Sequence, residues 1–186
     1  MNWEALHSHR IARSPSDLLV LAVKPNVQSE VIREIREIVL SAKDLCVVSI
    51  AAGRTSDQIY TDFGAAVPLV RVMPNVNAQI GQSMSALCPM GTTDEQLAAA
   101  RKLLDSVGET IVLDEKYFPV FTAIASSSPA WIFRMIDAMA EAGVNHGLTK
   151  ADSTRIVAQA FLGSAQLMLN GLDNGQVPAN LIDRVS

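Results

Sequence analysis

The sequence predicts an α/β fold in which a parallel sheet is followed by an all-α region. Up to about residue 113, short apolar runs alternate with segments of helical periodicity. The runs are continuous and rich in branched residues, which fits strands buried on both faces of a parallel sheet. After Asp114 the pattern changes to long apolar helices. We therefore predict a sheet domain over residues 1–113 and a helical domain over residues 114–186.

Each element of the sheet domain follows from its local pattern. The first strand is expected over residues 17–23, where the apolar run stops at Lys24-Pro25. Apolar residues at helical spacing then predict a helix over residues 27–40. The same reasoning predicts right-handed crossovers, strands over residues 45–50, 67–73, 83–87 and 110–113, and helices over residues 55–63 and 93–106.

Two apolar helices dominate the second region. Ser128-Pro129 opens the first, with the serine as an N-cap and the proline in the first turn, and it runs to about Ala142. Thr149 and Asp152 have capping-box spacing for the second, which runs to about residues 169–171. Because both helices are apolar on nearly all sides, they cannot easily bury each other completely. We expect them to form a dimer interface.

Composition narrows the function classes. Of 186 residues 49% are hydrophobic and 18% charged, an apolar share that suggests burial against another subunit. The net charge of −4 and the lack of a basic run argue against nucleic-acid binding. Cys46 and Cys88 lie in apolar runs and are expected to be reduced core thiols, and no Cys/His cluster suggests a metal site. The polar N-terminus is unlike a signal peptide, and without an apolar run of membrane-spanning length we expect a soluble, cytoplasmic protein.

Small or rigid residues follow three of the predicted strands. Ligands of open α/β sheets bind beyond the carboxyl ends of the strands. These ends read Ala-Val-Lys-Pro at residues 22–25, Ser-Ile-Ala-Ala-Gly at 49–53 and Val-Met-Pro-Asn at 72–75. Glycine and alanine allow the backbone to approach a flat ring or a ribose closely. Three ordinary strand-to-helix turns would explain the same residue types.

In order and spacing, these segments resemble pyrroline-5-carboxylate reductase. Two further segments extend the resemblance, Leu-Asp-Ser-Val-Gly-Glu at residues 104–109 and Thr-Ala-Ile-Ala-Ser-Ser-Ser-Pro-Ala-Trp at 122–131. Residues 141–165 are similar to the dimerisation helices of that family. The resemblance covers roughly residues 17–186 and implies a partial, Rossmann-like NAD(P)-binding domain followed by a helical dimerisation and substrate domain.

The resemblance also implies a reaction and a site. The family reduces the C=N bond of 1-pyrroline-5-carboxylate to give L-proline, the last step of proline biosynthesis, with hydride from NADPH or NADH. An already electrophilic iminium needs little acid–base catalysis, so we assign no general acid. The start of the Pro129 helix could hold a carboxylate, although a plain N-cap explains it as well. Carried over by position, the cofactor residues are Ala22, Val23, Lys24, Pro25, Ala51, Ala52, Gly53 and Asn75, and the substrate residues are Glu115, Ser126, Ser127 and Ser128.

The chain also departs from the family. It contains no G-x-G-x-x-G, the phosphate-binding loop that the family has upstream, so cofactor binding is expected to be weakened. It stops before the family's Ser-Pro-Gly-Gly-Thr stretch, and Ala125, Ser126 and Ser128 stand where the family has Ser, Gly and Gly. The first strand would form an open, apolar edge, so we expect either a piece of a longer protein or cover by another chain. Two other functions stay open, an inactive oligomerising remnant and a related dehydrogenase acting on a different imine or acid.

Overall fold

The computed structural model describes residues 18–42, 44–172 and 174–185, which form two compact units. One unit ends at Pro129 and the other begins at Ala130. This division lies after the predicted boundary at residues 113/114, because Phe118 and Phe121 pack on the sheet beside Ala86. The two units are therefore described separately. The expectation about a signal peptide concerns residues 1–17, which lie outside the described part.

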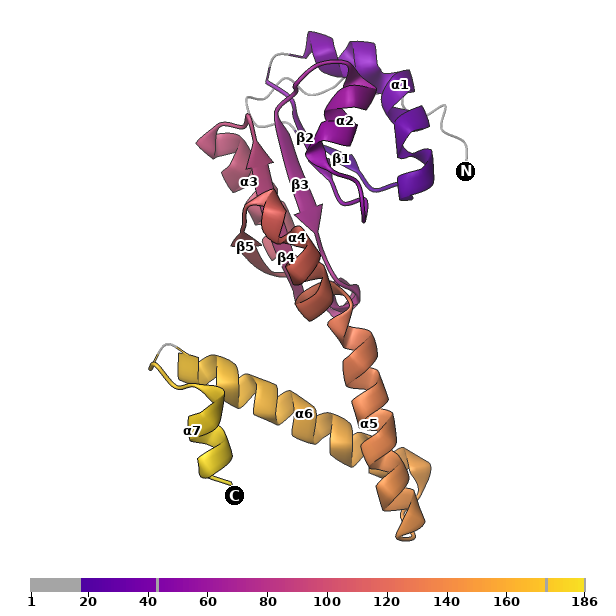
Figure 1. The fold of residues 1–186 in the computed structure, drawn as a ribbon, viewed down its shortest axis with the longest axis vertical. Helices are drawn as coiled ribbons and strands as arrows, with labels where there is room; N and C mark the ends of the chain where they lie inside the picture. The colour runs from indigo at the N-terminus through magenta and orange to yellow at the C-terminus, as the bar shows by residue number, and fades with distance from the viewer. Residues whose placement is uncertain (1–17, 43, 173, 186) are drawn as a thin grey trace. The chain divides into compact units, whose positions relative to one another are not determined.

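The first unit contains a five-stranded sheet in the order β1-β2-β3-β4-β5 (Figure 1). In the described part of the chain β1 lies at one edge, as expected, and pairs in parallel with β2. β2 and β3 are parallel, and so are β4 and β5, but β3 and β4 are antiparallel. The strands are β1 (Leu18–Leu21), β2 (Cys46–Ser49), β3 (Leu69–Met73), β4 (Ser83–Met90) and β5 (Gly108–Val112).

The predicted parallel sheet is confirmed except at one pair of strands, where β3 and β4 run antiparallel. A parallel connection needs a crossover of about a dozen residues or more. Residues 74–82 join β3 to β4 and contain only a short 3-10 helix (Val76–Ile80), so the chain reverses direction there. β4 also continues to Met90, beyond its predicted end at residue 87.

Helices cover both faces of the sheet, which explains the continuous apolar runs. One face packs against α1 (Pro25–Ser41) and α2 (Ser56–Phe63) through Ile32, Ile59 and Phe63. The other packs against α3 (Asp94–Asp105) through Ala100 and Leu104. All four residues of β2 are buried, as expected of a strand covered on both faces.

The predicted core thiols are confirmed. Cys46 and Cys88 are both buried and free. Burial raises the pKa of the Cys46 thiol to about 11, so this side chain stays protonated and unreactive at neutral pH. Among the described residues no cluster of histidine, cysteine and carboxylate side chains could hold a metal ion.

The second unit contains α6 (Lys150–Leu172), α7 (Pro178–Asp183) and most of α5 (Ser128–Asn145). The hydroxyl of Ser153 donates to the carbonyl of Ala140 at 2.7 Å and ties α5 to α6. The predicted cap is present, since the Thr149 hydroxyl accepts from the N–H of Asp152 at 3.1 Å. Large apolar side chains nevertheless stay exposed on both long helices, including Trp131, Phe133, Ile156 and Leu162.

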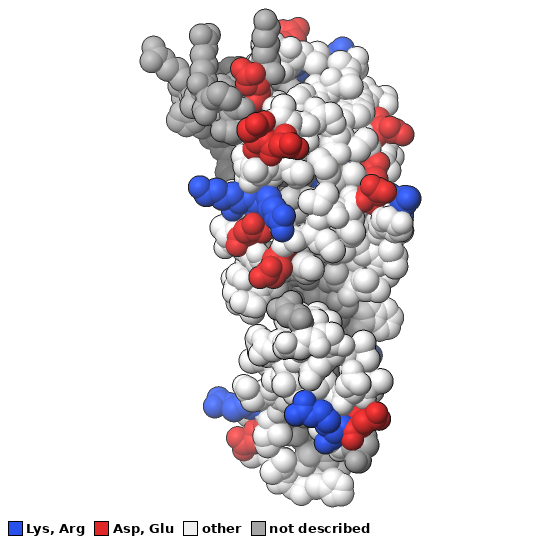
Figure 2. All heavy atoms as spheres, turned by 90° about the vertical axis from the view of Figure 1, so that its left-hand side faces the viewer, with Lys and Arg blue, Asp and Glu red and all other residues white. Residues whose placement is uncertain are grey.

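Charged side chains of both signs lie on the face drawn in Figure 2. On the face drawn in Figure 2, acidic and basic side chains lie interspersed, and no extended basic area gathers there. In the described part of the chain no helix is both long enough and apolar enough to cross a membrane.

Candidate active site

The first two predicted cofactor segments follow adjacent strands. β1 ends at Leu21 and β2 at Ser49, and these two residues face each other in the parallel ladder. The ladder extends one step further, because the N–H of Ile50 donates to the carbonyl of Leu21 at 3.2 Å. The residues that follow, 22–25 and 51–53, therefore both lie beyond the carboxyl ends of these parallel strands.

Most residues of these two segments are exposed. Ala22, Lys24, Pro25, Ala52 and Gly53 are exposed, whereas Val23 is half-buried and Ala51 is buried. Gly53 has a φ of +75°, a conformation that other residues rarely adopt, and nothing lies within 4 Å of where its Cβ would be. A flat ring could approach this backbone closely.

A buried polar network lies behind the two segments. Gln28, in the first turns of α1, has 0% exposure, and its Nε2 donates to Ser49 Oγ at 2.7 Å. Its Oε1 accepts from Arg54 Nε at 3.2 Å. Arg54 also pairs with Asp62 on α2, which accepts from the Ser29 hydroxyl at 2.8 Å. The network connects the end of β2, the loop after it and the start of α1.

The third segment, at the end of β3, contacts the serine-rich turn directly. Asn75 Nδ2 donates to the carbonyl of Ala125 at 3.1 Å, and the Ser126 hydroxyl donates to the carbonyl of Pro74 at 3.1 Å. Asn75 Oδ1 also accepts from the N–H of Asn77 at 3.1 Å, which fixes the amide orientation. Two segments about 50 residues apart are thus held together, as the proposed site requires.

The serine-rich turn does not end in the N-cap that was predicted at Ser128. Residues Thr122–Ser126 form a π-helical turn, and the N–H of Ser127 donates to the carbonyl of Thr122 at 2.8 Å. The Ser128 hydroxyl donates to the carbonyl of Ala125 at 3.1 Å instead of accepting as an N-cap. The N-cap prediction for Ser128 was wrong because the helix continues a preceding turn instead of starting from an extended residue. Such π turns often occur at functional sites.

Glu115 links three elements of the sheet unit. Its Oε1 accepts from the N–H of Ser56 and from Arg71 Nη1, both at 2.8 Å, and its Oε2 accepts from the Ser56 hydroxyl at 2.5 Å. Arg71, on β3, also lies 4.3 Å from the centre of the Phe118 ring. Burial raises the pKa of Glu115, but the hydrogen bonds from Ser56 and the positive charge of Arg71 outweigh burial and lower it overall.

Comparison with known proteins shows which proteins this chain is similar to. The family model for pyrroline-5-carboxylate reductase dimerisation matches residues 115–186. The pyrroline-5-carboxylate reductase of Methanosarcina acetivorans is 34% identical over 172 residues, which cover 92% of this chain and 62% of the relative. That of Escherichia coli is 35% identical over 171 residues, 91% of this chain and 62% of the relative. Over most of its own length this chain is similar to pyrroline-5-carboxylate reductases.

Solved structures of the family agree with the fold. The reductase from Coxiella burnetii has a TM-score of 0.82 at 30% identity, with 94% of this chain and 66% of that chain covered. The Plasmodium falciparum pyrroline carboxylate reductase, solved with NADP bound, has a TM-score of 0.80 at 25% identity, with 91% of this chain and 63% of that one covered. The chain spans about three fifths of the length of the relatives it matches.

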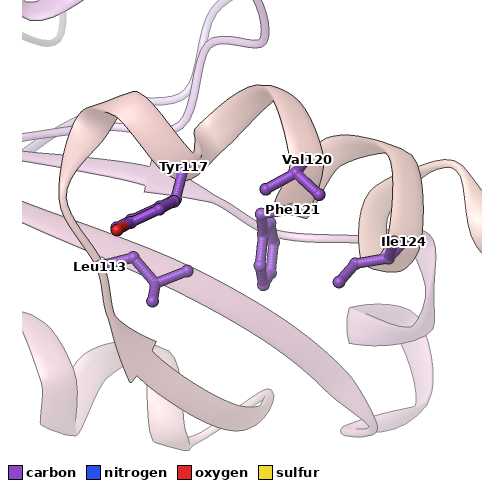
Figure 3. Close-up of a pocket in the computed structure, with 5 residues that line it drawn as sticks. All are labelled: Leu113, Tyr117, Val120, Phe121 and Ile124. Carbon is purple, nitrogen blue, oxygen red and sulfur yellow. The ribbon is translucent and has the colours of Figure 1, made fainter.

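A hollow in the first unit is lined by none of the predicted site residues. It has a volume of about 260 Å³ and is lined by Leu113, Tyr117, Val120, Phe121 and Ile124 (Figure 3). Its lining is apolar, so it offers no group that could orient a charged substrate. Four of the five lining residues fall within the match to the family's dimerisation model. A hollow of this chemistry suits apolar side chains of another protein surface.

Three residues of the site region were not predicted as such. Gln28 could have been found, because it lies four residues before Ile32 on the face of α1 that packs on the sheet. A polar residue on such a face needs a buried partner. The pairing of Arg71 with Glu115 and the contact of Arg54 with Gln28 have no local signal, since each joins segments more than 25 residues apart.

Proposed function

We propose that this chain takes part in the NAD(P)H-dependent reduction of 1-pyrroline-5-carboxylate to L-proline. The observation that carries the proposal is the contact between the end of β3 and the serine-rich turn, through Asn75 and Ser126. This contact holds Ser126, a predicted substrate residue, beside Asn75, a predicted cofactor residue, at the end of β3. The similarity to pyrroline-5-carboxylate reductases supports the same reaction.

In this proposal the strand ends bind the nicotinamide half of the cofactor. When bound, NADPH or NADH supplies a hydride to the carbon of the C=N bond, whose protonated nitrogen becomes the amine of L-proline. The exposed backbone at Ala52 and Gly53 leaves room for a flat ring. The solved relative from Plasmodium falciparum has NADP bound, which supports the choice of cofactor class.

The serine-rich turn would hold the substrate carboxylate. Ser127 is exposed, and the hydroxyls of Ser126 and Ser128 donate to backbone carbonyls of this region, which keeps the turn rigid. Rigid positioning of the C=N carbon is the main requirement, because hydride transfer to an iminium depends on distance and on exclusion of water. The carboxylate of Glu115 already accepts three hydrogen bonds from the protein. Glu115 would therefore stabilise the segment that leads into the serine-rich turn.

We further propose that the partner is a second copy of this chain. The second unit exposes apolar side chains such as Phe133 and Leu162, which a monomer would leave in water. The matched family model is one for dimerisation. Four of the five residues that line the apolar hollow of Figure 3 lie within the same matched region.

A titration and a rate measurement test the function. We expect micromolar binding of NADPH, followed by a fall in NADPH absorbance when 1-pyrroline-5-carboxylate is added. Gly53→Val should weaken binding, because a side chain is strained at this φ, whereas Gly91→Val would be a matched control at another positive-φ glycine. No binding at millimolar NADPH would leave the rival function, an inactive oligomerising remnant.

The rival has its own supporting observations. The sequence lacks a G-x-G-x-x-G loop, and β1 is an edge strand in the described part of the chain. Dimerisation without NADPH binding would favour the remnant. If NADPH binds but other cyclic imines are reduced faster than 1-pyrroline-5-carboxylate, a different substrate within the same reaction class is indicated.

A further inference from the structure

We propose that Gln28 is a positioning residue that sets the spacing of the first two cofactor segments, residues 22–25 and 51–53. The inference rests on the proposed function, since it assumes that these two segments hold the nicotinamide half of the cofactor. Gln28 does not touch a ligand in this proposal. It acts through Ser49, which stands two residues before the second segment, and Arg54, which directly follows it.

One side-chain amide thus holds both ends of a loop. Ser49 is the last residue of β2 and is 1% exposed, and Arg54 directly follows Gly53. Gln28 itself follows the first segment, because α1 begins at Pro25. Its Nε2 and Oε1 therefore connect the helix behind the first segment to the two ends of the second. A shift of the second segment relative to α1 would break at least one of these hydrogen bonds.

The amide has only one workable orientation. An arginine side chain only donates hydrogen bonds, so Arg54 requires the oxygen of Gln28, and the nitrogen must then face Ser49. Arg54 is held in turn by Asp62, which also accepts from Ser29, the neighbour of Gln28 on α1. The contacts close a ring from α1 through the loop and α2 back to α1, which fixes the loop more firmly than one bond could.

Core packing alone does not require glutamine at this position. Gln28 lies on the same face of α1 as the fully buried Ile32, where an aliphatic residue would pack without polar groups to satisfy. A buried amide is unfavourable unless hydrogen-bonded. The two bonds therefore indicate a requirement for geometry at this point of the fold.

A matched control separates positioning from stability. Gln96 is also a buried glutamine in the first turn of a helix, with Nε2 donating to the carbonyl of Asp44 at 3.3 Å and Oε1 accepting from the N–H of Thr93 at 3.0 Å. Gln96 follows β4, and β4 ends beside the first residue of β3. Gln96 therefore lies near the amino-terminal ends of the parallel strands, whereas the cofactor segments lie at their carboxyl ends.

The experiment compares Gln28→Leu with Gln96→Leu in the full chain. Both variants should unfold at lower urea concentration than the wild type. Only Gln28→Leu should raise the Kd for NADPH, by about five- to tenfold, and only it should speed amide hydrogen exchange across residues 50–54. Ser49→Ala, a milder change, should also raise the Kd for NADPH. The double variant should bind NADPH no more weakly than Gln28→Leu does.

Each outcome has a distinct meaning. An unchanged Kd and unchanged exchange in Gln28→Leu would overturn the inference while leaving the proposed function intact. An equal rise of the Kd in Gln96→Leu would assign the effect to stability and would overturn it too. A wild-type chain that does not bind NADPH would overturn the proposed function, and this inference with it.

Discussion

Replacing Glu115 by glutamine tests the most connected contact of the sheet unit. The substitution keeps the shape of the side chain but removes its charge, and its NH2 group must face either Ser56 or Arg71, which donate to the native carboxylate. Arg71 would keep its contact with Phe118 but would lose its ion pair, although it is only 8% exposed. The change therefore removes the negative charge from the acceptor of all three hydrogen bonds and places the NH2 group beside a group that donates in the native protein.

The size of the effect follows from those bonds. A hydrogen bond to a charged group contributes about 1.5–3 kcal/mol and a neutral one about 0.5–1.5 kcal/mol, a difference of roughly 1 kcal/mol for each of the three. Because the Glu115 side chain is 27% exposed, water screens part of this difference. We expect a loss of about 2 kcal/mol in the free energy of unfolding, equivalent to a Tm lower by roughly 4–8 °C.

The pH dependence gives the sharper test. The folded-state pKa of Glu115 is lowered, so its contribution is complete above the unfolded-state pKa of about 4.3 and is lost as the pH falls through the lower folded value. Urea unfolding at one fixed protein concentration should show the full gap between wild type and Glu115→Gln at neutral pH, and a much smaller gap near about pH 3. The exposed Glu37 on α1 provides the control, Glu37→Gln. A gap below about 0.5 kcal/mol at neutral pH, or one that acid leaves unchanged, would refute the reasoning.

Four further changes have defined outcomes. Asn75→Ala should lower the NADPH-dependent rate about tenfold by freeing the serine-rich turn, with little change in far-UV circular dichroism; an unaltered rate would contradict this role. Gly108→Ala should cost about 3 kcal/mol in urea unfolding, because a Cβ at this φ of +148° would overlap the backbone of Ser83. Val20→Lys should reduce turbidity on heating by placing a charge on the β1 edge, where Val20 is 41% exposed. Phe133→Glu should shift sedimentation equilibrium from dimer to monomer, and a persistent dimer would exclude this face.

Local patterns accounted for most elements of the sheet unit. The predicted strand over residues 45–50 corresponds to β2, and the predicted helix over residues 93–106 corresponds to α3. Thr93 caps α3 by accepting from the N–H of Gln96, while the Gln96 side chain accepts from the N–H of Thr93. Such signals are readable because they involve residues within one turn of each other.

The elements between residues 114 and 128 were missed for a physical reason. This segment consists of short 3-10, α- and π-helical turns, which have no long apolar period. Its conformation depends on distant contacts, above all those of Glu115 with Ser56 and Arg71. A pattern within one segment carries no information about partners 44 or 59 residues away.

The amino-acid sequence by itself determined the alternation of strands and helices, the burial of β2 on both faces and the family resemblance, because burial and capping impose a period on neighbouring residues. Only the tertiary structure decided the reversed direction of β4, the contact of Asn75 with the serine-rich turn and the buried hydrogen bond from Gln28 to Ser49. These features depend on which segments meet in space. Which segments come into contact depends on packing and hydrogen bonding across the whole sheet unit. A polar side chain reaches its partner only after both elements are in place.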